Sequence, residues 1–111
     1  MEFICSRVDF AKGLRLAEYL ADRVSTIPAL HGILLETNKN TLTIRSTDLN
    51  TGFEMTVPAR VKREGVGVIP IRPSIPLISA VAGDEVRVEV VDSMIHFTTH
   101  NTTSSVKGYR F

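Results

Sequence analysis

The chain has 111 residues, 43% of them hydrophobic, and a formal net charge of +1, which suits one packed domain of ordinary size. A net charge this close to zero argues against a domain that grips nucleic acid by bulk charge alone, but not against a local basic face. No run of about 20 apolar residues is present, which excludes a transmembrane helix, and charges interrupt the apolar N-terminus, which excludes a signal peptide. The single cysteine excludes an intrachain disulfide and suits a reducing cytoplasm.

The N-terminal part of the chain predicts a strand followed by a helix. Residues 2–8 alternate in polarity, as a strand with one buried face does. Asp9 has a side chain that suits a helix N-cap, and residues 9–24 carry apolar side chains at three- and four-residue steps. These side chains are Phe10, Leu14, Ala17, Leu20 and Ala21. Gly13 weakens this helix by up to about 1 kcal/mol relative to Ala, and its small size is compatible with the close approach of another backbone.

Residues 31–59 predict three consecutive antiparallel strands on which the rest of the chain must pack. Apolar and polar side chains alternate strictly in each of them, which indicates a sheet with one buried and one wetter face. The expected buried rows are Ile33, Leu35 and Thr37, then Leu42, Ile44 and Ser46, then Phe53, Met55 and Val57. Two polar breaks, Asn38–Asn40 and Thr47–Asn50, have the side chains of turns.

The remainder repeats this order of elements. Residues 60–67 predict a polar connector, residues 66–71 a strand, and residues 73–82 a second, weaker helix. Further strands are expected at 85–91, 94–99 and 102–111. The sequence therefore predicts an α+β fold in which a β-α-β-β-β unit is duplicated, with halves of about 1–59 and 66–111 and two helices on one face of antiparallel sheets. Because the second half stops at Phe111 without a helix cap or polar tail, we expect a chain cut from a longer protein.

Groups that could carry chemistry are few. Cys5 lies within a strand and has no His–Asp pattern beside it, which argues against a nucleophile. His96 and His100 are four residues apart, but in a strand that spacing does not converge side chains on a metal. Asp48 suits a turn cap better than a catalytic carboxylate, and Asn101-Thr102-Thr103 matches a glycosylation acceptor by chance, since no signal peptide precedes it. The sequence thus predicts no catalytic site, no metal and no cofactor.

Four segments carry a resemblance to a known family. They are Ile27-Pro28-Ala29-Leu30, Gly32-Ile33-Leu34-Leu35, Leu42-Thr43-Ile44 running into Thr47-Asp48-Leu49, and Val68-Ile69-Pro70-Ile71-Arg72. Together they make the chain similar, from Met1 to Tyr109, to the N-terminal domain of the bacterial sliding clamp, the beta subunit of DNA polymerase III. The resemblance implies the DNA-clamp fold and a non-catalytic processivity factor of DNA replication. It also implies a cytoplasmic homodimer ring that encircles duplex DNA without sequence specificity and tethers the polymerase.

The same resemblance implies two functional surfaces. The DNA-facing residues would lie on or beside the two helices: Lys12, Arg15, Arg23, Val24 and Arg72. The family usually carries an arginine where Val24 stands, and more basic residues in the second helix than Arg72, so we expect weaker DNA contact here or a substitute role for Arg23. The subunit interface would comprise Pro73, Leu77, Asn101, Thr103, Ser104, Ser105 and Val106. We expect the final strand to be a sheet edge and Val106 to be its apolar contact with the partner.

Binding of DNA polymerase III and of the clamp loader is implied for later domains of the family, which this chain does not contain. We expect the isolated domain to be a monomer or a weak dimer. Two other readings of the sequence are kept: an interaction module of the same α+β class that binds protein and not DNA, and a small enzyme domain. A cleft gathering two titratable groups with shifted pKa values would favour the enzyme, and an open reading frame continuing for about two more domains would favour the clamp.

Overall fold

The structure is a computed structural model that describes residues 1–20, 32–47, 52–70, 83–99 and 102–108. This part of the chain contains helix α1 (Arg7–Leu20) and eight strands. The strands are β1 (Glu2–Ser6), β2 (Gly32–Asn38), β3 (Thr41–Thr47), β4 (Gly52–Arg63), β5 (Gly65–Pro70), β6 (Glu85–Val91), β7 (Met94–Thr99) and β8 (Thr102–Lys107). The helix is too short and too polar to cross a membrane, as is true of every helix in the described ranges.

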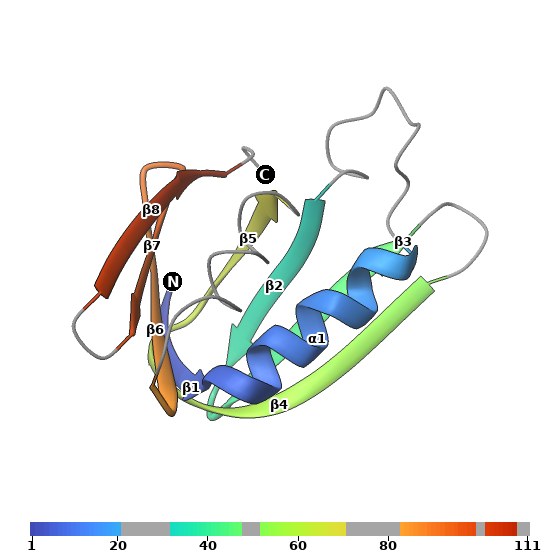
Figure 1. Ribbon diagram of the computed structural model, residues 1–111, viewed down its shortest axis with the longest axis horizontal. Helices are drawn as coiled ribbons and strands as arrows, with labels where there is room; N and C mark the ends of the chain where they lie inside the picture. The colour runs from blue at the N-terminus through green and yellow to red at the C-terminus, as the bar shows by residue number, and fades with distance from the viewer. Residues whose placement is uncertain (21–31, 48–51, 71–82, 100–101, 109–111) are drawn as a thin grey trace.

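The strands form one antiparallel sheet in the order β5-β2-β3-β4-β1-β6-β7-β8. Figure 1 shows α1 lying across the part of the sheet made by β2, β3 and β4, while β6, β7 and β8 stand at an angle to that part. The predicted meander of three strands is therefore confirmed as β2-β3-β4, and a second meander, β6-β7-β8, follows it in the chain. Strand β8 lies at one edge of the sheet, as expected for the final strand.

The strand pairings of the two halves correspond to one another. If β1 to β4 are exchanged for β5 to β8, the first meander becomes the second, and the pairing of β1 with β6 becomes that of β5 with β2. A duplicated unit would make these pairings, whereas the pairing of β1 with β4 has no counterpart, because β5 and β8 lie at opposite edges of the sheet. The helix predicted at residues 73–82 lies outside the described residues, so one helix is described, and the two-helix arrangement stays a prediction.

The core fills the space between α1 and the sheet. Phe10, Leu14 and Ala17 of the helix are buried, as the three- and four-residue spacing predicted, and Ala11 is buried as well; the predicted positions Leu20 and Ala21 lie outside the described side chains. On the sheet, the predicted inward rows of β2 and β3 are buried, and Val57, Val86, Val88, Ile95 and Phe97 continue them across β4, β6 and β7. Phe10 joins the parts of this core, because its ring lies 6.0 Å from that of Phe3 and 6.3 Å from that of Phe97, between centroids.

Two predicted boundaries are wrong. The helix begins at Arg7, and Ser6 is its N-cap, since the Ser6 hydroxyl accepts a hydrogen bond from the Asp9 N–H at 3.2 Å; Asp9 instead lies in the first turn. Residues 60–63 are not a connector but the end of β4, where they pair with β1 after residues 52–58 have paired with β3. Only Glu64 separates β4 from β5.

Gly13 was expected to admit another backbone, but it admits a side chain. A β-carbon on Gly13 would lie 2.5 Å from Cδ1 of Ile44 on β3, well inside van der Waals contact. The glycine thus lets α1 settle closely onto β3.

Two hairpin turns have the left-handed backbone that suits the twist of an antiparallel pair. In the turn between β6 and β7, φ is 54° at Asp92 and 75° at Ser93. Between β2 and β3 the left-handed residue is Lys39, with φ of 55°, rather than an asparagine. The second turn predicted in the first meander falls largely on residues 48–51, outside the described residues.

Candidate nucleic-acid interface

Helix α1 is held onto the sheet by its apolar face and by one buried hydrogen bond. The Ser46 hydroxyl of β3 donates to the Ala17 carbonyl at 2.7 Å, and Ser46 is 8% exposed. A buried hydroxyl without a partner would cost free energy, so this bond both satisfies Ser46 and fixes the C-terminal half of α1 over β3. The alternating pattern predicted that Ser46 faces inward, but its partner could not be inferred from the sequence.

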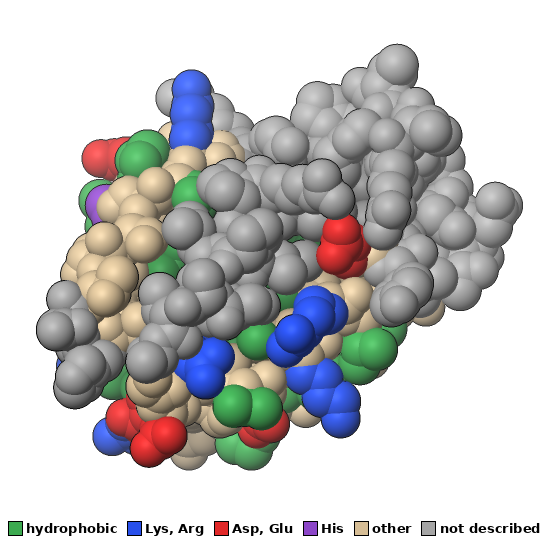
Figure 2. All heavy atoms as spheres, viewed as in Figure 1, with side chains coloured by type: hydrophobic (Ala, Val, Ile, Leu, Met, Phe, Trp, Pro, Cys, Tyr) green, Lys and Arg blue, Asp and Glu red, His purple; other side chains and the backbone are tan. Residues whose placement is uncertain are grey.

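The opposite face of α1 carries two cations. Lys12 and Arg15 are exposed and lie three residues apart, which places them one turn apart on the same side of the helix. Neither forms an ion pair or hydrogen bond with another described residue. Figure 2 shows Lys and Arg side chains standing over the position of α1.

Apolar side chains flank these two cations. Val8 is 59% exposed and Leu16 is 39% exposed, and both belong to α1. The exposed face of α1 therefore carries a short cationic stripe, Lys12 and Arg15, bordered by these aliphatic groups and by the exposed carboxylate of Asp9 in the first turn. The sequence analysis did not single out Val8 or Leu16. Both are apolar residues that do not belong to the predicted buried stripe of the helix, and this mismatch could have identified them as exposed.

Four arginines on the outer side of the sheet are arranged differently, because each of them has a carboxylate beside it. They are Arg45, Arg60, Arg63 and Arg87. Arg45 of β3 lies between Glu36 of β2, at 2.6 Å, and Glu54 of β4, at 2.7 Å. The hydrogen bonds that Arg45 donates to Glu54 and to Glu36 raise the pKa of its guanidinium, so the side chain stays charged and its charge is balanced by the two carboxylates. This residue would not serve a phosphate without giving up its carboxylate partners.

A second set of ion pairs crosses β4, β1 and β6. Its members are Arg60 with Glu85 at 2.7 Å, Arg63 with Glu89 at 3.2 Å, Arg63 with Glu2 at 3.9 Å, and Arg87 with Glu2 at 3.4 Å. All four arginine–glutamate pairs lie at the surface, where a single pair contributes little stability. Their consequence here is electrostatic, since the charge of each of these arginines is balanced by a carboxylate, whereas the exposed Lys62 of β4 has no ion pair with a described residue.

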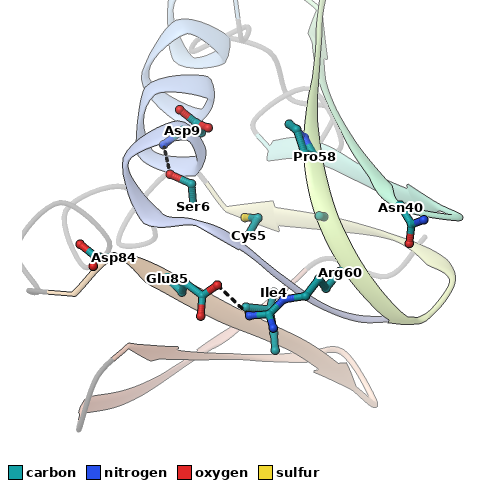
Figure 3. A pocket seen from close by; sticks show the side chains of 10 residues that line it. Ile4, Cys5, Ser6, Asp9, Asn40, Pro58, Arg60, Asp84 and Glu85 are labelled. Carbon is teal, nitrogen blue, oxygen red and sulfur yellow. Dashed lines mark hydrogen bonds and ion pairs between the residues drawn. The ribbon is translucent and has the colours of Figure 1, made fainter.

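An open groove lies where β1 passes into α1 (Figure 3). Its walls carry three carboxylates, Asp9, Asp84 and Glu85, against one guanidinium, Arg60, which is paired with Glu85. Excess negative charge of this kind would repel a polyanion. The groove therefore adds nothing to a phosphate-binding surface, and the cationic stripe of α1 is the better candidate.

Cys5 borders this groove but is 4% exposed. Desolvation by burial, followed by the negative charges of Asp9 and Glu85, raises the pKa of its thiol to about 12. A thiol protonated at neutral pH is a poor nucleophile. The structure places Cys5 in the core.

The predicted DNA-facing residues are only partly described. The structure brings Lys12 and Arg15 together on α1, whereas Arg23, Val24 and Arg72 lie outside the described residues. Of the predicted subunit-interface residues, Pro73, Leu77 and Asn101 also lie outside the described part of the chain.

The remaining predicted interface residues lie on β8, and they are divided between its two faces. Thr103 and Ser105 are exposed and Ser104 is partly exposed, while Val106 is 7% exposed and belongs to the hydrophobic core. Val106 pairs with Ile95 of β7 and faces inward. Val106 therefore lies on the core side of the strand, and the contact of this edge and of Val106 with a partner stays a prediction.

Polar pairs link β8 to β7 on the outer side. His96 Nδ1 lies 2.6 Å from the Ser105 hydroxyl, and the hydroxyls of Thr98 and Thr103 lie 3.4 Å apart. Within the described residues no three His, Cys, Asp or Glu side chains gather in a way that could hold a metal ion. His100, the second histidine of the pair weighed in the sequence, lies outside them.

Comparison with known proteins gives a consistent result. Residues 1–107 match the family described as DNA polymerase III beta subunit, N-terminal domain. A curated relative, the beta sliding clamp of Treponema pallidum, is 24% identical over 101 residues, which are 91% of this chain and 27% of the relative. The chain thus spans about a quarter of the length of that relative.

Solved structures of sliding clamps share the fold. The clamp of Bacillus subtilis superposes with a TM-score of 0.92 at 15% identity, over 98% of this chain and 31% of that one. The Helicobacter pylori beta clamp, solved with a DNA ligase peptide bound, gives a TM-score of 0.91 at 20% identity, over 99% of this chain and 31% of that one. At such identities the likeness establishes the fold: an antiparallel sheet with α1 packed against it.

Proposed function

The chain belongs to the DNA polymerase III beta subunit family, whose N-terminal domain its residues 1–107 match, and from this premise we propose that it is the DNA-facing first domain of a sliding clamp. In this role it encircles duplex DNA without reading its sequence and helps to hold the replicative polymerase on its template. The domain is non-catalytic and works in the cytoplasm.

The observation that carries this proposal is the unequal pairing of the cations. A clamp that slides needs positive charge toward the duplex, where phosphate contacts are independent of sequence, and little of it elsewhere. Lys12 and Arg15 on α1 have no described partner, while Arg45 and its neighbours on the sheet are compensated by carboxylates. This distribution supports α1 as the element that faces DNA and the sheet as the outer wall.

We place two further contacts beside these, although they lie outside the described residues. Arg23 would follow α1, and Arg72 would begin the second helix of the duplicated unit, at residues 73–82. The matching strand pairings of the two halves support that duplication. Val24, the next residue in the sequence, would accompany Arg23 on the DNA side without a charge to contribute.

The ring itself would form through the edge strand β8. An edge presents unpaired N–H and C=O groups that another strand can meet, and β8 is at the end of the sheet. In the proposed homodimer the partner chain supplies that strand, with Thr103, Ser104 and Ser105 beside the seam and Pro73, Leu77 and Asn101 near it. DNA polymerase III and the clamp loader would bind to parts of the protein beyond this domain.

The test of sliding is topological. A chain extended to the length of its relatives is assembled on a nicked circular duplex, and the circle is then cut once with a restriction enzyme. A clamp should stay on the circle through gel filtration and leave after linearisation, because it is held by encirclement and by weak phosphate contacts. Retention on the linear duplex would indicate ordinary binding, and no retention on the circle would favour the protein-binding module without DNA binding.

A further inference from the structure

Arg7, the first residue of α1, makes two hydrogen bonds to a segment far away in the chain. Its backbone N–H donates to the Asp84 carbonyl at 2.9 Å, and its Nε donates to the Gly83 carbonyl at 2.6 Å. We propose that Arg7 is a positioning residue, which fixes the N-terminal end of α1 so that Lys12 and Arg15 are held toward duplex DNA. This inference rests on the proposed function and adds a residue that does not itself touch the nucleic acid.

The two bonds prolong the ladder between β1 and β6 into the helix. Ser6 is paired with Glu85 in that ladder. The N–H of Arg7 then meets the carbonyl of the preceding residue, Asp84, and the guanidinium meets the next carbonyl, that of Gly83. The first residue of α1 is therefore joined to the beginning of β6, so the helix cannot tilt there without breaking bonds to the second half of the chain.

The partner side of this contact needs a particular backbone. Gly83 has φ of 115°, a left-handed conformation that glycine adopts without the strain it imposes on other residues. In that conformation the Gly83 carbonyl accepts the hydrogen bond from Nε of Arg7. A glycine at position 83 therefore suits the contact with Arg7, in addition to following the helix predicted at residues 73–82.

A positive charge at this place also needs an explanation. The N-terminus of a helix carries the positive end of the macrodipole, so a cation there is disfavoured. Arg7 is partly buried, and a charge-assisted hydrogen bond to a carbonyl offsets that cost. Its direction differs from that of the cationic stripe, because five residues rotate the helix by about 140° between Arg7 and Lys12.

The position of the stripe depends on both ends of α1. The bond from Ser46 to the Ala17 carbonyl holds the C-terminal half, and Arg7 holds the first turn. Lys12 and Arg15 lie between these two points, about 7.5 and 12 Å along the axis from Arg7. A tilt of α1 about the Ser46 contact would carry Lys12 away from phosphates that it reaches in the intact domain.

Two substitutions separate positioning from direct contact. In Arg7→Gln the amide nitrogen stands at the same place along the side chain as Nε, so a donor to Gly83 remains and the charge is lost. In Arg7→Lys the charge remains, but a methylene stands where Nε was. We measure duplex DNA affinity against salt concentration with the full-length protein, and thermal unfolding in parallel.

If Arg7 positions α1, Arg7→Gln should keep the affinity and the salt slope, whereas Arg7→Lys should weaken affinity on the order of threefold or more. If Arg7 contacts phosphate, the result should reverse, with Gln losing about one unit of salt slope and Lys keeping it. That reversal overturns the inference. So does a change in unfolding temperature that leaves the affinity of both variants unaltered, since it would reduce Arg7 to a structural role.

A double-mutant cycle tests whether Arg7 affects DNA binding through Lys12 and Arg15. Introduced into Lys12→Ala/Arg15→Ala, the Arg7→Lys change should have little further effect on affinity, because the groups through which it acts are gone. Fully additive losses would overturn the positioning role while leaving the proposed function intact. If Lys12→Ala/Arg15→Ala itself leaves the salt slope at its wild-type value, the DNA-facing role of α1 fails, and the inference fails with it.

Discussion

The exposed face of α1 and the outer side of the sheet both carry cations, but these cations differ in whether a carboxylate lies beside them. On α1, Lys12 and Arg15 stand without a described partner, whereas Arg45 on the sheet is held between Glu36 and Glu54. The chain as a whole has a net charge of only +1, so neither surface could be recognised from composition. Attraction for a polyanion depends on which charges are locally uncompensated, and by that measure the helix face differs from the sheet.

The largest expected effect comes from placing a charge on the buried side of the sheet, which contrasts with both exposed surfaces. Val106→Asp should lower the free energy of unfolding by several kcal/mol, because an unpaired carboxylate would enter the core. Lys107→Asp, one residue along and on the exposed side of β8, should cost far less. Urea unfolding of this chain and the two variants measures both. Equal stability of the two variants would mean that the two sides of β8 are not distinguished as the structure places them.

A smaller effect, on binding, contrasts the two exposed surfaces directly. Reversing the charges of α1 in Lys12→Glu/Arg15→Glu should weaken duplex DNA binding by the full-length protein on the order of tenfold or more at low salt. The matched control, Arg60→Glu/Arg87→Glu, reverses the same number of charges on the sheet and should weaken binding much less. Fluorescence anisotropy with a labelled duplex gives both values. Comparable losses from both pairs would erase the distinction between the surfaces and leave only net charge.

The strand pattern was predictable because alternation of polarity specifies which side chains face inward. It correctly gave the buried rows of β2 and β3 and the β6-β7 hairpin, each of which has apolar residues at every second position. The end of β4 was missed because three of the four residues 60–63 are charged, and nothing in the sequence marks the point where a strand stops pairing with β3 and begins to pair with β1. The burial of Val106 was missed for a related reason, since its neighbours at the inward positions of β8, Thr102 and Ser104, are polar.

The candidate site was predictable only as a set of residue types. Lys12 and Arg15 could be placed on the outer face of a helix from their spacing alone. The compensation of Arg45 could not, because it depends on the register that sets β3 between β2 and β4. Likewise, the bond from Arg7 to Gly83 joins residues 76 positions apart, and nothing local to either residue indicates it.

The dependence of stability on alkaline pH tests the burial of the Cys5 thiol in the core between the two surfaces. The pKa of the Cys5 thiol is raised from 9.0 to about 12, so the folded state holds this proton more tightly than the unfolded state. Its contribution to stability is complete below about pH 9 and should be lost between pH 9 and 12, at up to about 1.4 kcal/mol per pH unit. Urea unfolding of wild type and Cys5→Ala across this range measures the difference in slope. Parallel curves would show that the thiol titrates normally and that the core beside the groove admits charge.

The smallest expected effect separates stability from binding at single cations, one from each surface. Arg45→Met removes the guanidinium from between two carboxylates and should slightly lower the melting temperature at low salt. The loss should shrink at 1 M salt, where the Debye length is about 3 Å and the exposed pairs are screened. Duplex DNA affinity should stay the same, because a compensated arginine contributes no phosphate contact.

The matched variant on the other surface should do the reverse. Lys12→Met removes an exposed cation that has no described partner, so the melting temperature should hold at both salt concentrations, while the salt slope of DNA binding falls by about one unit. The two methionine variants thus exchange their phenotypes if compensation decides the role of each cation. A loss of DNA affinity in Arg45→Met equal to that in Lys12→Met would show that phosphate competes successfully with Glu36 and Glu54, and that the ion pairs of the sheet do not shield it from DNA.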